Sequence, residues 1–190
     1  LHVFEQACRA LNRFQGVDGD HPLYMSINLS GRQVEDPDLP GQLDELIERT
    51  GVDPSRLKLE ITETLLMDNP ELAEATLMRL RALGAKVAID DFGTGYSSLN
   101  YLHRFPLDTL KIDRSFVMTM LGNDRSLQIV RVLTDLSRSL DMDIIAEGVE
   151  TLEERERLAQ FRCDYGQGYL FARPQPEEEM IAFLAERPRW

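Results

Sequence analysis

Segments with the character of strands alternate with helical segments along nearly the whole chain, and this order limits the possible folds most. Six short apolar segments indicate strands, at residues 23–30, 56–62, 86–92, 108–113, 141–148 and 162–171. Between them lie segments of helical character, such as residues 70–84, which begin with a proline and end with a glycine. Parallel strands need such helical crossovers, so the alternation predicts an α/β fold with a parallel sheet.

The number of strands indicates an incomplete barrel. A (β/α)8 barrel has eight strands and typically runs to about 250 residues, whereas this chain has 190 residues. We therefore predict a TIM-like (β/α)8 barrel, seen as about six strand–helix units with the first two strands absent. No glycine fingerprint follows the first strand, so a dinucleotide-binding fold has little support.

The beginning of the chain supports the same interpretation. It starts directly in a helical pattern, without a methionine or a capping residue, and the apolar positions of this pattern are Leu1, Phe4, Ala7, Leu11 and Phe14. We expect residues 1–190 to be one domain that is truncated at its N-terminus.

The composition limits the classes of function. A net charge of −12 argues against a surface for nucleic-acid polymers. The three histidines do not cluster, which argues against a zinc site. Cys8 and Cys163 are far apart, as expected for reduced thiols in a cytosolic protein. No apolar segment approaches the roughly 20 residues of a membrane span. We expect the domain to lie in the cytoplasm. A domain on the cytoplasmic side of a membrane-anchored parent protein would also meet this expectation.

Polar side chains occur where each predicted strand ends. They are Asn28, Glu60, Asp90 with Asp91, Lys111 with Asp113, Glu147 and Gln167. Taken one at a time, each has a structural explanation: Glu60 could form a salt bridge with Lys58 or Arg56, and Lys111 a surface ion pair with Asp113. In a barrel, however, the carboxyl ends of the strands meet on the face where active sites are built. The common position therefore predicts one active site.

The types of side chain favour a centre with two metal ions. Amide and carboxylate oxygens suit Mg²⁺ or Mn²⁺ rather than zinc or copper. Two adjacent acids, Asp90 and Asp91, allow one carboxylate to bridge two ions while its neighbour binds the second. Two such ions about 3.5–4 Å apart commonly clamp a phosphodiester. The ammonium group of Lys111 could then stabilise charge in the transition state.

The sequence resembles the EAL domain, the bacterial phosphodiesterase specific for cyclic di-GMP. Six motifs carry the resemblance in family order: SINLS (26–30), LEITE (59–63), AIDDFGTGYSSLNYL (88–102), LKIDRSFV (110–117), IIAEGVET (144–151) and QGYLFARP (167–174). The Glu-Ala-Leu motif itself and a nearby Leu-Leu-Arg segment, which give the family a metal-binding glutamate and a phosphate-binding arginine, do not occur in this chain. The expected truncation accounts for this difference.

The resemblance implies a role for each strand-end residue. Asn28, Glu60 and Asp90 are similar to the ligands of the first metal ion, with Asp90 bridging, and Asp91 and Glu147 to ligands of the second. Lys111 resembles the residue that holds or activates the attacking water. Asp113 and Gln167 resemble supporting groups that contact the substrate. Glu63 resembles the glutamate that anchors the loop Phe92–Ser98, which in the family couples the metal site to dimerisation.

The resemblance also implies the reaction and the partners. We expect hydrolysis of one phosphodiester of cyclic di-GMP to linear diguanylate (pGpG) in bacterial signalling, supported by Mg²⁺ or Mn²⁺ and inhibited by Ca²⁺. The expected partners are a second copy, bound through residues 92–102, and an upstream sensory or GGDEF-type domain. Alone, residues 1–190 should show little activity, because a metal ligand is missing and two sheet edges stay open.

Two other functions remain open. A catalytically inactive receptor for cyclic di-GMP, or a pure interaction module, is the first alternative. The second is a metal-dependent barrel enzyme that acts on a carbonyl acid, similar to the enolases.

Overall fold

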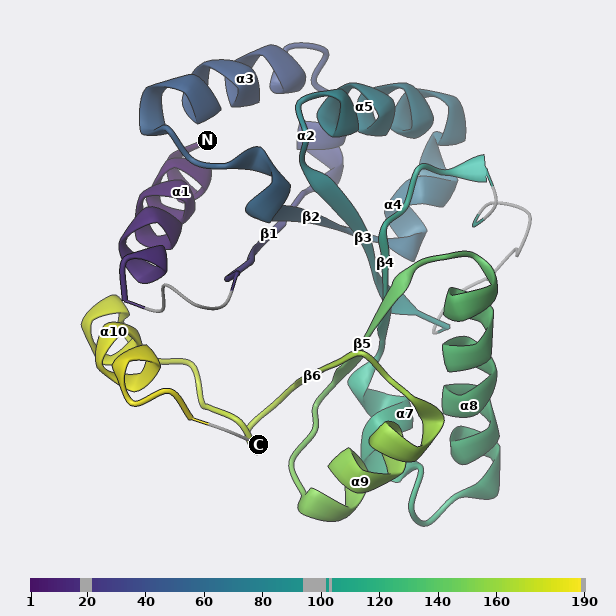
Figure 1. Cartoon of the computed structure of the whole chain (residues 1–190). Helices are drawn as coiled ribbons and strands as arrows, with labels where there is room; N and C mark the ends of the chain where they lie inside the picture. The colour runs from purple at the N-terminus through teal and green to yellow at the C-terminus, as the bar shows by residue number, and fades with distance from the viewer. Residues whose placement is uncertain (18–21, 94–101, 103, 189–190) are drawn as a thin grey trace. The chain divides into compact units, whose positions relative to one another are not determined.

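The computed structural model describes residues 1–17, 22–93, 102 and 104–188. Strands alternate with helices along this part of the chain (Figure 1). The strands are β1 (Met25–Asn28), β2 (Leu57–Thr62), β3 (Lys86–Phe92), β4 (Thr109–Ile112), β5 (Asp143–Glu147) and β6 (Tyr165–Gln167). The longer helices are α1 (His2–Gln15), α3 (Leu39–Thr50), α5 (Pro70–Ala82), α8 (Asp124–Ser139), α9 (Leu152–Phe161) and α10 (Glu177–Ala185).

The strands follow one another in the sheet in the order β1-β2-β3-β4-β5-β6, and neighbouring strands pair in parallel. Parallel strands in sequence order arise when each helical crossover returns the chain to the end of the sheet where the previous strand began, and adds the next strand on the same side with the same handedness. The predicted fold class, a TIM-like α/β architecture seen as six strand–helix units, is confirmed. Within the described part of the chain, no helix is long and apolar enough to cross a membrane.

The predicted strands all form, and the additional elements are short. Among the described residues, three brief helices were not predicted: α2 (Gly31–Val34), α4 (Glu63–Asp68) and α7 (Arg114–Thr119). A helix of one to two turns contains too few residues to show a periodic apolar pattern. The predicted turn after α3 contains a 3-10 turn, η1 (Pro54–Arg56).

The chain divides into two compact units. The first comprises Leu1–Glu60, Asn69–Val87 and Pro174–Trp190. Its helix α1 buries Phe4 and Leu11, as the sequence pattern predicted, and also Cys8, which the pattern did not include. Leu1 precedes the helix and is 49% exposed, so it does not belong to the buried positions that the pattern predicted. Both cysteines of the chain are free thiols.

The second unit comprises Ile61–Asp68 and Ala88–Arg173. Its helix α8 buries Val130 and Leu133 together with hydroxyl side chains. The Thr134 hydroxyl donates to the Val130 carbonyl at 2.8 Å, and the Ser137 hydroxyl donates to the Thr134 carbonyl at 3.0 Å. These internal hydrogen bonds satisfy polar groups that would otherwise be costly to bury. The sequence pattern alone could not decide between Leu133 and Thr134 at this face, and the structure buries both.

A leucine on β4 tests the packing of the second unit. Leu110 is fully buried, whereas Leu152, at the start of α9, is 64% exposed. We expect Leu110→Ala to lower the free energy of unfolding by about 2–5 kcal/mol, because it removes buried apolar surface and leaves a cavity. Leu152→Ala, the same substitution on the surface, should change it by less than about 0.5 kcal/mol. Urea unfolding of both variants measures the difference, and equal effects would contradict the assigned core.

Candidate functional site

The two adjacent acids of β3 lie in a β-bulge. The register of β3 against β4 shifts between Ile89 and Phe92, so Asp90 and Asp91 together stand opposite the single residue Lys111. Asp91 has a φ of 55°, in the left-handed region that aspartate adopts more readily than most residues. In a regular strand, neighbouring side chains point to opposite faces. A bulge changes the direction of a side chain, and here both carboxylates reach the same place.

The oxygens of Asp90, Asp91 and Glu147 converge at this place. One carboxylate oxygen from each lies within 4.8 Å of the others, although β3 and β5 are separated in the sheet by β4. We call these three residues the acid cluster. The sequence predicted that the polar residues of all strand ends converge, and within the second unit the geometry brings these three acids together.

Lys111, on the strand between them, links the acid cluster. Its Nζ lies 3.1 Å from Asp90 Oδ1 and 2.6 Å from Glu147 Oε1. The side chain of Lys111 is only 3% exposed, so both ion pairs are shielded from solvent. A surface ion pair with Asp113, the simple structural explanation for this lysine, is therefore wrong.

The electrostatics of the acid cluster favour a cation. Burial, followed by the negative charges of Asp90 and Asp113, raises the pKa of the Asp91 carboxyl, while Lys111 and Arg114 act against this rise. A divalent ion among these carboxylates would relieve the repulsion that one ammonium group only partly offsets. The donors are hard oxygens, which fit Mg²⁺ or Mn²⁺.

Asn28 and Glu60 belong to the first unit. Asn28 is the last residue of β1, Glu60 lies within β2, and the two stand opposite each other in the register of these strands. Glu60 is 4% exposed, and Asn28 is exposed. The Leu29 amide donates to the Glu60 carbonyl at 2.8 Å and extends this pairing past the end of β1. The assignment of Asn28 and Glu60 as ligands of the first metal ion stays a prediction.

Gln167 and Asp113 lie at strand ends of the second unit. Gln167 is exposed and stands opposite Glu147 in register. The Asp113 carboxylate caps helix α7: it accepts a hydrogen bond from the Ser115 amide at 3.0 Å and another from the Ser115 hydroxyl. Asp113 therefore stabilises the start of α7, whether or not it contacts a substrate. Substrate contact by Asp113 and Gln167 stays a prediction.

Glu63 is the first residue of α4 and is 3% exposed. Its Oε2 accepts a hydrogen bond from the Gly93 amide at 3.3 Å, while its Oε1 is buried without a hydrogen bond among the described residues. The predicted anchoring concerns the loop Phe92–Ser98, of which residues 94–98 lie outside the described part of the chain. The contact with Gly93 is at the start of this loop, and the anchoring role stays a prediction.

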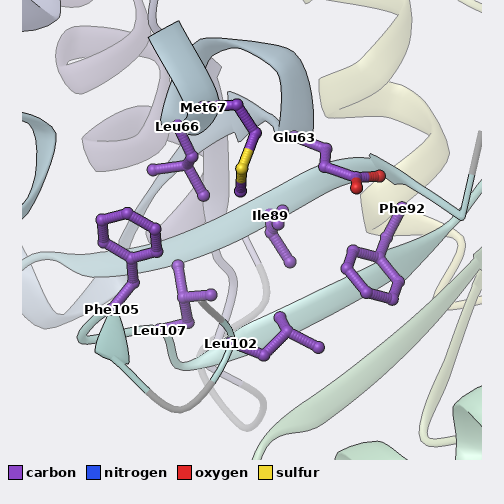
Figure 2. A pocket seen from close by; sticks show the side chains of 8 residues that line it. All are labelled: Glu63, Leu66, Met67, Ile89, Phe92, Leu102, Phe105 and Leu107. Carbon is purple, nitrogen blue, oxygen red and sulfur yellow. The ribbon is translucent and has the colours of Figure 1, made fainter. Parts of the chain in front are cut away.

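A small apolar cavity lies beside Glu63 (Figure 2). Its volume is ≈ 10 Å³, about the minimum that one water molecule needs. Side chains from α4, from β3 and from residues 102–107 line it: Leu66, Met67, Ile89, Phe92, Leu102, Phe105 and Leu107. These side chains surround the carboxylate with apolar surface, so a hydrogen bond to it is well shielded from water.

Two glycines that we did not single out from the sequence directly follow β5 and β6, and the chain passes very close to its neighbours there. A Cβ on Gly148, which has a φ of 71°, would lie 2.6 Å from the Arg114 Cβ. A Cβ on Gly168 would lie 2.1 Å from the Val149 carbonyl oxygen. Only glycine permits such close approach. The signal was present, since each glycine directly follows a polar strand-end residue, Glu147 or Gln167.

Lys111 should stabilise the fold as well as the site. In Lys111→Ala, the carboxylates of Asp90 and Glu147 lose a buried cation, so we expect the free energy of unfolding to fall by about 3–5 kcal/mol without divalent ions. Added Mn²⁺ should restore part of this loss. Lys86→Ala is the control. Lys86 is half-buried, and its one charged contact among the described residues is with the Tyr24 ring, whose centre lies 5.2 Å from Nζ; such a contact is worth about 1 kcal/mol. Urea unfolding with and without Mn²⁺ measures both effects, and equal losses in the two variants would contradict the assignment.

Known proteins are similar to this chain in sequence and in fold. A family model for the EAL domain matches residues 1–174. NbdA of Pseudomonas aeruginosa, named a cyclic di-GMP phosphodiesterase, is 38% identical over 182 residues, which cover 96% of this chain and 23% of NbdA. The chain spans about a quarter of the length of the curated relatives that it matches.

Solved structures agree with the sequence comparison. The PaMucR phosphodiesterase in complex with c-di-GMP is 38% identical, with a TM-score of 0.86 over 94% of this chain and 72% of PaMucR. BlrP1 of Klebsiella pneumoniae, in a complex with manganese and cyclic di-GMP, is 34% identical, with a TM-score of 0.77 over 87% of this chain and 42% of BlrP1. Both the sequence and the fold therefore show that this chain belongs to the EAL domain family.

Proposed function

We propose that the protein containing this chain hydrolyses one phosphodiester bond of cyclic di-GMP and releases linear diguanylate, pGpG. The acid cluster around Lys111 carries this proposal, because it combines ligands for divalent ions with a buried ammonium group at 3.1 Å and 2.6 Å from two of them. The names of NbdA and PaMucR support the same reaction class and substrate.

We propose Mg²⁺ or Mn²⁺ as the metal cofactor. Asn28, Glu60 and Asp90 would hold the first ion, with Asp90 bridging, and Asp91 and Glu147 the second. When bound, the ions act as Lewis acids that offset the negative charge of the reacting phosphodiester. The donor set supports this assignment, and BlrP1 complexes contain manganese or calcium together with cyclic di-GMP.

Lys111 would orient the attacking water and stabilise the negative charge that develops on the phosphate. Its ammonium group has three N–H donors, and Asp90 and Glu147 hold it in one place. It can donate to the attacking water or to a phosphate oxygen, so that a positive charge is already in position when the negative charge of the phosphate grows. Little rearrangement is needed at that moment, because the lysine is 2% exposed.

The polar groups around Lys111 would contact the substrate. Gln167 offers an exposed amide next to Glu147 in the sheet, and this amide can both donate and accept a hydrogen bond. Asp113 caps α7 and would keep the chain after Lys111 in position. An inactive receptor would have no need of three convergent carboxylates, so the acid cluster favours hydrolysis over simple binding.

Removing a metal ligand should remove turnover. We expect Asp90→Asn and Glu60→Gln each to lower the rate of cyclic di-GMP hydrolysis by roughly 100-fold or more, because each removes a charged ligand of a metal ion. The free energy of unfolding should change little in both variants. Asp141→Asn is the matched control, since Asp141 is exposed in the turn before β5 with a φ of 56° that asparagine tolerates.

The assay is chromatographic separation of cyclic di-GMP from pGpG with Mg²⁺, Mn²⁺, Ca²⁺ or a chelator, using the longest protein that contains this chain. Turnover with Mg²⁺ or Mn²⁺, but neither with Ca²⁺ nor with the chelator, is the expected result. Normal rates for Asp90→Asn at saturating Mg²⁺ would contradict the metal assignment. Binding of cyclic di-GMP without cleavage by the unaltered protein would replace the proposed enzyme with a receptor.

Glu63 should act on turnover through the loop that it contacts. We propose that it anchors the loop beginning at Phe92, and that residues 92–102 form the contact between two copies of the domain. Glu63→Ala removes the acceptor for the Gly93 amide, so we expect turnover to fall by about 10-fold. Glu63→Gln keeps an oxygen that can accept this hydrogen bond, and it should retain more activity. Turnover and sedimentation measure the two roles, and an unchanged rate with unchanged dimerisation would reject both.

A further inference from the structure

A groove in the second unit is lined by residues of helix α8 and of the C-terminal end of α9. The two helices are labelled in Figure 1. The volume of the groove is ≈ 330 Å³, which is within the range of small-molecule sites. Six residues line it: Arg131, Asp135 and Arg138 from α8, and Gln160, Phe161 and Arg162 from the end of α9. We call these residues the arginine groove. The helix ends that form it precede the starts of β5 and β6, whereas the acid cluster lies at the ends of strands.

The arginine groove is positive in a negative protein. It carries three guanidinium groups and one carboxylate, while the whole chain has a net charge of −12. Arg131, Asp135 and Arg138 are spaced by four and three residues and therefore share one face of α8. A concave, positive surface of this kind raises the local concentration of anions.

The guanidinium groups are available to a ligand. Within the described residues, the side chains of Arg131 and Arg162 form no ion pair or hydrogen bond. Arg138 makes two long contacts: its Nη1 lies 3.5 Å from Asp135 Oδ1, and its Nη2 donates to the Phe161 carbonyl at 3.3 Å. The second contact links α8 to the end of α9 across the groove. A doubly charged oxyanion is a stronger acceptor than either partner.

The backbone at Arg162 adds an independent observation. Arg162 caps α9 with a φ of 63° and a ψ of 40°, in the left-handed region. Glycine or asparagine is usual at this position, because a longer side chain is strained there. Arg162 therefore keeps a long, charged side chain at a backbone position that glycine would occupy with less strain.

We propose that the arginine groove binds the phosphate groups of a small polyphosphate-bearing molecule, at a site separate from the acid cluster. Planar guanidinium groups bind phosphate oxygens in pairs, and this geometry favours phosphate over a point-like anion. Three arginines match two or more linked phosphates. Gln160 and Phe161, which also line the groove, offer an amide and an aromatic ring that could contact a nucleoside attached to the phosphates. Such phosphate groups occur in free inorganic pyrophosphate, and they occur attached to a nucleoside in a nucleoside triphosphate.

Calorimetric titration of the chain with pyrophosphate and with ATP tests the proposal, in the presence of EDTA so that binding through metal ions at the acid cluster is prevented. We expect both to bind, and more weakly as the salt concentration rises. Arg131→Gln should weaken binding by about 10-fold, because it removes one charged hydrogen-bonding group. Arg155→Gln is the matched control, since Arg155 lies on α9 but does not line the groove.

Arg162→Gly separates binding from folding. Glycine relieves the left-handed backbone, so we expect the unfolding temperature to rise by about 2 °C while pyrophosphate binds about 10-fold more weakly. Tighter binding of ATP than of pyrophosphate would assign the site to nucleotides, and equal binding would assign it to phosphate groups alone. No binding of either probe, equal binding to the Arg131→Gln, Arg162→Gly double variant, or tighter binding of a hexa-aspartate peptide than of pyrophosphate would overturn the proposal.

Discussion

The charge balance around Lys111 is the interaction on which the second unit depends. Three carboxylates converge there, and a single buried ammonium group pairs with two of them. Like charges this close repel each other strongly in a shielded environment. The lysine offsets part of that repulsion, and the remaining negative charge favours divalent ions at this place. Stability and the capacity to bind metal therefore oppose each other at the same atoms.

Backbone geometry gives this balance its shape. A bulge in β3 lets two consecutive aspartates reach one place, and glycines after Glu147 and Gln167 let the following chain pass close to its neighbours. The buried carboxylate of Glu63 binds the Gly93 amide just after the bulge. Each of these features lies at the carboxyl end of a strand, where parallel α/β proteins build their sites. The remainder of the core of the second unit is mostly aliphatic, with buried phenylalanine, methionine and hydroxyl side chains among the leucines, isoleucines and valines.

The second unit carries opposite charge at its two sets of element ends. Acids gather where the strands end, and arginines gather where α8 and α9 end, just before the next strands begin. The acid cluster suits cations and, through them, a phosphodiester. The arginine groove suits phosphate groups directly. A chain with a net charge of −12 would therefore bind phosphate groups in two different ways, through metal ions at the acid cluster and through guanidinium groups at the arginine groove.

The sequence by itself determined the strands, their parallel order, the family and the polar residues at the strand ends, because alternation and local motifs are properties of neighbouring residues. It could not determine the bulge at Asp90 and Asp91, since register depends on the partner strand. Nor could it determine that Lys111 pairs with Asp90 and Glu147, which are distant in sequence, or that Arg131 and Arg162 line one groove. Those pairings were decided by the tertiary structure, because packing places side chains from different elements within reach of each other.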